Sequence, residues 1–380
     1  MARRVREKER TEKKPKKVGY FDYNLLFIVI FLMCFGLVML YSSSSYTSMN
    51  KYGDSAYYLK LQIRNMLIGS VFMIFFTFAD YRVWKKFGGM AYIVAFLLCC
   101  AVAIPGIGSS SHGSSRWLSL GPLSFQPSEL AKLAIILFLA TLIERVPKSM
   151  NKTVSLLKVF AVLVPIVGII AYSNLSTAII VLGIAVCMLF VASPKYAPFI
   201  SVGIAGVAVI LIFLFSATYR QGRVQAWLHP ETAGDAGYQT LQGLYAIGSG
   251  GLFGKGLGES IQKMGNVPES QNDMIFTIIC EELGLFGAIC VILLYILLIW
   301  RMMVIANNAN DLYGALLVVG IMSHIAIQVI LNIAVVTNTI PNTGVTLPFI
   351  SYGGTSVLFL MSEIGLVLSV SRGIKLESMR

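Results

Sequence analysis

The sequence has too little charge for a water-soluble protein of its length. Only 13% of its 380 residues are Asp, Glu, Lys or Arg, whereas 56% are hydrophobic. A soluble domain has about 25% charged residues, so this chain cannot cover a globule of its size with polar surface. The same composition excludes a disordered chain and a collagen-like one. An integral membrane protein with many spans remains.

The six cysteines lack the spacing of a metal or redox site. All six fall inside apolar segments, and none belongs to a Cys-x-x-Cys pair or to a Cys/His pattern of a zinc site. They are Cys34, Cys99, Cys100, Cys187, Cys280 and Cys290. We interpret them as small buried hydrophobic residues and exclude zinc and thiol chemistry.

A nucleotide-binding motif is also missing. The glycine-rich segment 248–258 fits neither GxGxxG nor the P-loop pattern, and no parallel strand is expected before it. We interpret it as a turn whose glycines let the backbone approach a lipid surface or a phosphate group.

The net charge of +12 is concentrated in the N-terminal tail. The first twenty residues contain nine Lys or Arg against three Glu, without interleaved aromatic residues. We interpret 1–21 as a cytoplasmic tail attracted to anionic lipid, and we predict no nucleic-acid partner. The following apolar run, Leu25 to Tyr41, has no cleavage site, so we expect a retained first span rather than a signal peptide.

Ten apolar segments approach the roughly 20 residues that a helix needs to cross a bilayer. They are 22–42, 60–79, 88–105, 126–144, 154–172, 175–192, 198–217, 274–300, 312–336 and 355–371. We therefore predict an all-α, polytopic integral membrane protein with a ten-span domain over 22–372 and a cytoplasmic C-terminus, 373–380. Basic residues follow the even-numbered spans, which predicts both termini in the cytoplasm of a multi-pass protein of the cytoplasmic membrane.

The connections on the predicted outer side are long and rich in Gly, Ser and Pro. The largest, 218–273 between the seventh and eighth spans, is too long for a simple connection. Within it, Tyr238, Leu241, Leu244 and Tyr245 recur at helical spacing, which predicts a short helix at the membrane interface.

Ionisable residues inside the predicted spans need partners, because a charge at membrane depth costs about 2.5–3.5 kcal/mol on insertion scales. Glu129 and Lys132 lie three apart on one helical face and can neutralise each other. Glu281 and Glu282 need a cation or a proton.

The ninth span carries a polar stripe formed by His324, Gln328 and Asn332. Because nothing titratable in the sequence joins this stripe, we favour hydrogen bonding between helices over a functional role.

Asp273, directly before the eighth span, has two open interpretations. As an N-cap it would accept backbone hydrogen bonds, which contribute about 1 kcal/mol. As a functional carboxylate at the water–lipid boundary it would take a proton from a hydroxyl group of a lipid-linked substrate. The outer loops supply cations that indicate an anionic ligand such as pyrophosphate. These are Arg116, Arg220, Arg223, Lys255 and Lys263.

Several stretches match motifs of one known family. They are Ser114–Leu118, Gln126–Lys132, Gly237–Gly258, Val267–Glu269 with Asp273–Phe276, Glu281–Gly284 and Pro341–Gly354. On these residues the chain resembles the SEDS family (shape, elongation, division and sporulation), which includes FtsW, RodA and SpoVE, and the FtsW/SpoVE branch most. The resemblance runs from about residue 22 to 372. The chain departs from it at Asn174, where an acidic residue is usual, and at Asn272 and Asn342.

The resemblance implies a peptidoglycan glycosyltransferase that polymerises lipid II on the outer face of the membrane during cell division. It assigns the family's essential aspartate to Asp273, as general base, and its Glu/Lys pair to Glu129 and Lys132. Glu269, in the matching Val-Pro-Glu motif, is expected to bind substrate with these residues and the outer cations.

No covalently bound cofactor is implied, and no residue is assigned as a metal ligand, although a divalent cation, Mg²⁺ or Mn²⁺, fits the pyrophosphate chemistry. The expected partners are lipid II, a monofunctional class B penicillin-binding protein (a transpeptidase), other divisome proteins and membrane lipid.

Two further functions stay open. A lipid II flippase or other lipid transporter should carry cations through the bundle to the inner leaflet. A non-catalytic divisome scaffold would not need Asp273 beside a cationic outer cleft.

Overall fold

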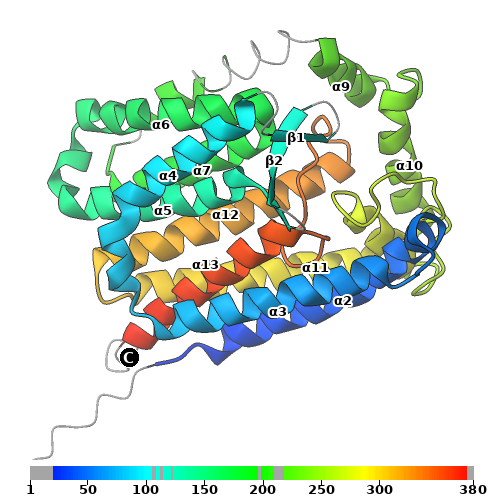
Figure 1. Cartoon of the computed structure of the whole chain (residues 1–380), viewed down its shortest axis with the longest axis horizontal. Coiled ribbons are helices and arrows are strands. Elements are labelled where there is room, and N and C mark those ends of the chain that lie inside the picture. Colours follow the sequence, from blue (N-terminus) through cyan, green and yellow to red (C-terminus); the bar gives the residue numbers. More distant parts are fainter. Residues whose placement is uncertain are drawn as a thin grey trace, which may run out of the picture.

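In the computed structural model the chain forms a bundle of long helices that run side by side (Figure 1). The structure describes residues 20–104, 108–111, 114–120, 123–195, 198–204, 206, 208 and 218–374. Among these residues, eight helical segments are long and apolar enough to cross a membrane. They are α2 (Tyr23–Tyr52), α3 (Tyr57–Phe78), Tyr81–Ala103, α6 (Thr153–Ser173), α7 (Leu175–Ala192), α11 (Ile275–Asn307), α12 (Leu312–Val336) and α13 (Gly354–Gly373). The protein is a predominantly helical, multi-pass membrane protein.

The segment Tyr81–Ala103 combines a short 3₁₀ helix, η1 (Tyr81–Phe87), with α4 (Gly88–Ala103). A second 3₁₀ helix, η2 (Pro147–Asn151), precedes α6. The predicted tails lie almost entirely outside the described residues. Of the predicted span 198–217, the structure describes 198–204, 206 and 208, which are helical.

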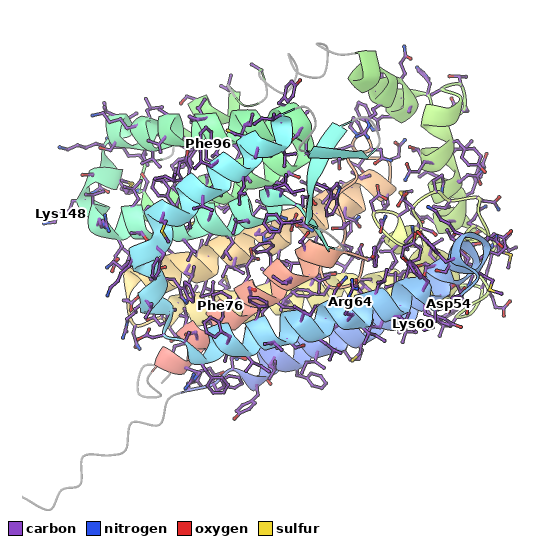
Figure 2. The ribbon with its side chains drawn as sticks, viewed as in Figure 1. Asp54, Lys60, Arg64, Phe76, Phe96 and Lys148 are labelled. Carbon is purple, nitrogen blue, oxygen red and sulfur yellow. The ribbon has the colours of Figure 1, made fainter. Side chains whose placement is uncertain are left out.

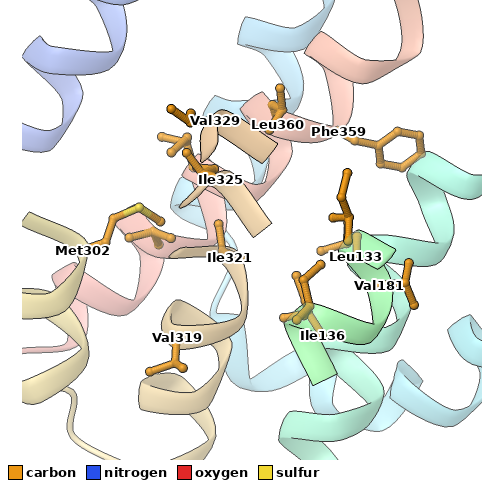
Figure 3. Packing of buried hydrophobic residues seen from close by; sticks show 14 of the residues in the cluster. Leu133, Ile136, Val181, Met302, Val319, Ile321, Ile325, Val329, Phe359 and Leu360 are labelled. Atoms are coloured by element: carbon orange, nitrogen blue, oxygen red, sulfur yellow. The ribbon is translucent and has the colours of Figure 1, made fainter. Parts of the chain in front are cut away.

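The helix α5 (Pro127–Arg145) carries charged residues at both ends, so it is less apolar than its neighbours. It is nevertheless among the most buried helices, because it packs against α4, α7 and α12. Apolar side chains of α5, α7, α11, α12 and α13 meet in the core, including Leu133, Val181 and Ile325 (Figure 3). Large apolar side chains on the outside of α2, α3 and α11 stay exposed, such as Phe27 and Trp300, as expected for helices in contact with lipid.

The ends of the bundle are polar. The exposed ion pair between Asp54 and Lys60 lies at one end, and Lys148 lies at the opposite end (Figure 2). Charge at both ends with apolar sides between them is the pattern of a bundle that crosses a bilayer.

Helix α2 extends ten residues beyond the predicted first span. The serines from Ser43 onward were predicted to lie in a loop. Ser42, Ser43 and Ser44 are buried in the structure, and the Ser42 hydroxyl donates to the Glu282 carboxylate. Tertiary packing therefore keeps this polar segment helical.

A small antiparallel sheet corrects the all-α prediction. Strands β1 (Gly108–Ser111), β2 (Ser114–Leu120) and β3 (Leu123–Phe125) lie in the order β1-β2-β3, where the sequence predicted an irregular outer loop. Leu118 pairs with Gly108 on one side and with Phe125 on the other. The sheet lies beside α4, α5 and α6, and β3 also contacts α13.

The long connection before α11 contains two helices, α9 (Thr218–Leu228) and α10 (Asp235–Ser249). The short helix predicted from the Tyr238–Tyr245 spacing is thus present as α10, whereas α9 was not predicted. Helix α10 lies at the end of the bundle opposite the C-terminus (Figure 1) and packs against α11.

Helix α11 is broken at Gly284, whose φ of 67° and ψ of −166° are not helical. A side chain would be strained at this φ, and it would also clash with the backbone of the glycine-rich segment. The sequence predicted one continuous helix here.

The glycine-rich segment supplies the hydrogen bonds that the break would otherwise lose. Four backbone N–H groups donate across the contact: Lys255 to Glu281 O (3.0 Å), Gly256 to Glu282 O (3.0 Å), Leu285 to Gly251 O (2.9 Å) and Phe286 to Leu252 O (3.0 Å). A methyl group on Gly254 would clash with the backbone of Glu282. The predicted glycine-rich turn is therefore present, and the close approach that its glycines allow is to the backbone of α11.

Candidate active site

A cavity of about 900 Å³ lies among α3, α5, the sheet, α9, α10 and the segments that precede α11 and α13. Five of the predicted site residues line it: Glu129, Lys132, Arg223, Glu269 and Asp273. They come from two helices, α5 and α9, and from the loop before α11, which are far apart in the sequence. The fold therefore gathers acidic and basic side chains around one space.

Asp273 lies in the cavity wall directly before α11 and is only 8% exposed. Met274 is the N-cap residue of α11, and no side chain caps that helix end, so the N-cap interpretation of Asp273 is wrong. Its Oδ1 atom is buried and has no hydrogen-bond partner among the described residues. Burial raises the pKa of Asp273 to about 7, the Glu269 carboxylate acts in the same direction, and the Arg223 guanidinium opposes them.

The backbone around Asp273 is held by polar side chains. The Asn332 amide donates to Asp273 O at 2.8 Å and to Val345 O at 2.7 Å. The Ser351 hydroxyl donates to Asn272 O at 2.6 Å. Asn332 thus makes the contact between chain segments that the polar stripe of α12 predicted, and the Asp273 carboxylate sits on a fixed backbone.

Glu129 and Lys132 form the ion pair that their spacing predicted. Lys132 Nζ lies 2.8 Å from Glu129 Oε1, and both side chains are buried in α5. Lys132 Nζ also donates to Gln328 Oε1 at 3.2 Å. The second carboxylate oxygen of Glu129 is buried without a partner among the described residues. The cavity therefore has two carboxylates whose hydrogen-bonding capacity is not used up.

Arg223 and Glu269 lie on the α9 side of the cavity. Arg223 Nη1 donates to Asn342 O at 3.1 Å, and the Asn342 side chain donates to Gln239 Oε1 at 3.0 Å. Glu269 has a φ of 54°, rare for a residue with a side chain, and accepts a hydrogen bond from the Asn272 amide. This ties α9, α10 and the loop before α13 together at the cavity.

Two predicted cations cannot be placed by their side chains. Arg116 belongs to β2 and Arg220 to α9, and both side chains lie outside the part of the chain that the structure describes.

Lys255 and Lys263 do not line the cavity, so the prediction that they join Asp273 in one cleft is corrected. Lys255 Nζ pairs with Glu281 Oε1 at 2.6 Å, and Lys263 Nζ pairs with Glu282 Oε1 at 2.8 Å. These are the cations that the two glutamates were expected to need. They hold the long connection 218–273 onto α11.

The sequence reasoning missed Arg64, which lines the cavity from α3 (Figure 2) together with Tyr57 and Tyr352. Arg64 is a charge inside a predicted span, the same signal that singled out Glu129 and Lys132. Asn174, which departs from the family pattern, also lines the cavity, where its side chain accepts from Thr177 N.

His324 has a titratable partner that the sequence did not indicate. Its Nδ1 atom lies 2.8 Å from Glu363 Oε2 on α13, and both side chains are buried. The expectation that nothing titratable joins this stripe is therefore wrong.

Comparison with known proteins places the chain in a family. Residues 23–376 match the FtsW/RodA/SpoVE family model, described as cell cycle protein. Stage V sporulation protein E of Bacillus subtilis is 40% identical over 92% of this chain and 97% of its own length. A probable peptidoglycan glycosyltransferase FtsW of a Geobacter species is 36% identical over 94% of this chain and 98% of its own.

Solved structures agree. A chain from work on structural coordination of polymerization and crosslinking by a peptidoglycan synthase complex superposes with a TM-score of 0.74 at 26% identity, covering 93% of this chain and 98% of its own. The rod shape determining protein RodA of Thermus thermophilus superposes with a TM-score of 0.67 at 27% identity, covering 93% and 97%. The chain therefore belongs to the FtsW/RodA/SpoVE family of cell cycle proteins.

Proposed function

We propose that this protein is a peptidoglycan glycosyltransferase that polymerises lipid II into glycan strands during cell division. The names of its FtsW relatives support the activity. The observation that carries the proposal is the buried Asp273 carboxylate, one oxygen of which has no hydrogen-bond partner among the described residues, in a large cavity that also holds Arg223 and Lys132.

Asp273 acts as the general base. The 4-hydroxyl of the acceptor sugar is a poor nucleophile at neutral pH, and a carboxylate with a pKa of about 7 is suited to take its proton. The hydroxyl oxygen then forms a bond to the anomeric carbon of the donor, while the bond from that carbon to the lipid pyrophosphate breaks. The proton ends on Asp273, and the pyrophosphate leaves as an anion.

Cationic side chains of the cavity stabilise that leaving group. Arg223, Arg64 and the Lys132 ammonium line the cavity with Asp273, and arginine and lysine are the side chains that bind phosphate oxygens. Glu269, which lines the cavity, remains part of the proposed substrate site, together with Arg116 of β2 and Arg220 of α9.

A divalent cation, Mg²⁺ or Mn²⁺, enters only as a companion of the substrate. Within the described residues no group of three or more His, Cys, Asp or Glu could hold a metal ion by itself. Mg²⁺ is commonly held by one or two carboxylates together with substrate phosphates. Glu129 and Asp273 could supply these carboxylates. When bound, such an ion would neutralise charge on the pyrophosphate.

The proposal includes a topology. Ten spans result when α5 and the segment 198–217 are added to the eight apolar helices. The large loop 218–273 then lies on the outer face, and both termini lie in the cytoplasm. The proposed partners are a class B penicillin-binding protein, other divisome proteins and the surrounding lipid, as expected for a relative of a peptidoglycan synthase complex.

The test is polymerisation of labelled lipid II by the purified protein with a transpeptidase partner. Asp273→Asn keeps the volume and removes the base, so we expect a folded protein that is about 10²–10⁴-fold slower. Near wild-type polymerisation by this variant would refute the general-base role. Transbilayer movement of lipid II without polymer, by the wild type, would instead favour a flippase.

A further inference from the structure

A continuous line of buried polar side chains leads from the cavity wall into the middle of the bundle. It starts at the Glu129–Lys132 ion pair, passes through Gln328 and His324 of α12, and ends at Glu363 of α13. Lys132, Gln328, His324 and Glu363 are each at most 2% exposed. Buried polar side chains cost free energy unless they are hydrogen-bonded, so a connected line of them in the core indicates a specific role.

The orientation of the Gln328 amide is fixed by its neighbours. The Gln328 Nε2 group donates to the carbonyl oxygen of Thr346 at 3.0 Å, and that oxygen can only accept. The Lys132 ammonium, which can only donate, lies 3.2 Å from Gln328 Oε1. The amide oxygen therefore faces both Lys132 and His324.

This orientation determines the protonation of His324. Its Nε2 atom lies 2.9 Å from Gln328 Oε1, an acceptor, so Nε2 carries a proton and donates it. Nδ1 and Glu363 Oε2, 2.8 Å apart, must share a further proton, because two lone pairs would repel at that distance. Glu363 thus selects the tautomer of His324 that supports Gln328.

We propose that His324 and Glu363 are positioning residues, which hold the Gln328 amide and, through it, the Lys132 ammonium at the cavity wall. This inference rests on the proposed function, in which Lys132 binds the pyrophosphate of lipid II. Glu129 holds the ammonium from one side and Gln328 from another, so the cation keeps a fixed place when the substrate arrives.

A double variant separates positioning from stability. His324→Phe with Glu363→Leu replaces the buried pair by apolar side chains of similar size, a change that is often neutral for folding. Without His324 the Gln328 amide should no longer hold the Lys132 ammonium. We expect a folded protein whose KM for lipid II is raised about tenfold, which corresponds to the loss of this one hydrogen bond to a charged group. The pH dependence of kcat, set by Asp273, should not move.

Glu363→Gln is the conservative variant. Its amide N–H can donate to His324 Nδ1, so the imidazole keeps its Nε2 proton and its contact with Gln328. We expect a KM within about twofold of wild type. The neighbours Ser323→Ala and Ser362→Ala are matched controls, because their hydroxyls donate only within their own helices, to Val319 O and Leu358 O.

Two kinetic results would overturn the inference: wild-type constants in the double variant, or a loss in Glu363→Gln as large as in the double variant. Failure of the proposed function looks different, because the wild type would then make no polymer.

A second readout does not depend on activity. The chain has three histidines, so His112→Gln with His229→Gln leaves His324 as the only imidazole. Its ¹⁵N spectrum should show a protonated Nε2 whose signal shifts in Lys132→Met, because Gln328 Oε1 then loses its other donor. An unprotonated Nε2 would refute the assignment even if no variant could be assayed.

Discussion

Two regions of this protein use glutamate and lysine in opposite ways. Where the long connection 218–273 meets α11, every carboxylate oxygen of Glu281 and Glu282 has a hydrogen-bond partner. Glu281 accepts from Lys255, Ser260, and the backbone N–H groups of Ile261 and Gln262, and Glu282 accepts from Ser42 and Lys263. In the cavity, Glu129 and Asp273 each keep a buried oxygen without a partner among the described residues.

The difference distinguishes a structural contact from a reactive site. We call the structural contact of Glu281 and Glu282 with Lys255 and Lys263 the fastening. A carboxylate whose oxygens all have partners offers a ligand little acceptor capacity, and its partners are engaged in holding it. An unsaturated buried carboxylate carries an energetic cost that a substrate hydroxyl or a cation can relieve. Residue type alone does not distinguish the two regions, because both contain a Glu and a Lys in contact. The degree of saturation does.

The largest expected effect on folding is at the fastening. Lys263→Met leaves Glu282, which is fully buried, without its cation, and breaking a buried pair in this way costs about 3–5 kcal/mol. We expect a clear drop in the thermal unfolding temperature in detergent. The double change with Glu282→Leu should recover part of the loss. A stable Lys263→Gln protein with a raised KM for lipid II would contradict the comparison, because it would make Lys263 a substrate ligand.

The cavity pair should respond in activity as well as in stability, because both side chains line the cavity. Glu129→Ala and Lys132→Ala each leave one charge unpaired near hydrocarbon, at a cost of several kcal/mol. We expect each single change to abolish polymerisation and the double change to lose no more than either one. The measurement is a double-mutant cycle on polymerisation rate. Strictly additive losses would mean that the two side chains act independently.

The pH dependence should follow the Asp273 carboxylate. Because its pKa is raised to about 7 and the base must be ionised, the rate should rise about tenfold from pH 6 to pH 8. Glu269→Gln removes a charge that raises this pKa, so the profile should move to lower pH, and Arg223→Gln should move it to higher pH. If neither variant moves the pH profile, the observed titration does not belong to Asp273.

The same shift makes a prediction for stability. A carboxyl whose pKa is higher in the folded protein than in the unfolded chain binds its proton more tightly when folded. Folding stability therefore falls as pH rises from about 4 to about 7, and then levels off. Asp273→Asn removes this penalty, so its gain in unfolding temperature over wild type should grow across that range. A gain that is constant with pH would point to packing instead.

The smallest expected effect tests Arg64 as an additional substrate cation. Arg64 and Lys60 lie one turn apart on α3, but only Arg64 lines the cavity, while Lys60 pairs with Asp54 in solvent (Figure 2). Arg64→Gln should raise the KM for lipid II about five- to tenfold, the value of one charge-assisted hydrogen bond. Lys60→Gln should leave it unchanged, since exposed ion pairs contribute little. Equal responses would place both residues among surface charges.

Features that depend on neighbours along the chain could be predicted from the sequence. Apolar length gave the ends of α7 and α12 at the same residues that the structure shows. Helical spacing gave the pairing of Glu129 with Lys132, because side chains three apart share a face. The resemblance to the SEDS motifs pointed to Asp273, which the fold then placed in the cavity.

Features that depend on contacts between residues far apart in the sequence could not be predicted. Lys255 and Lys263 looked like ligands because nothing local showed that the chain turns back and brings them onto Glu281 and Glu282. Likewise, His324 and Glu363 lie on different helices, and helix packing alone brings them together. An apolar segment has the same composition whether its side chains face lipid or the protein core. The break at Gly284 and the walls of the cavity were therefore decided by tertiary packing. The sequence determined which segments enter the membrane and which charges need partners, whereas only the tertiary structure decided which charges are satisfied and which stay available for chemistry.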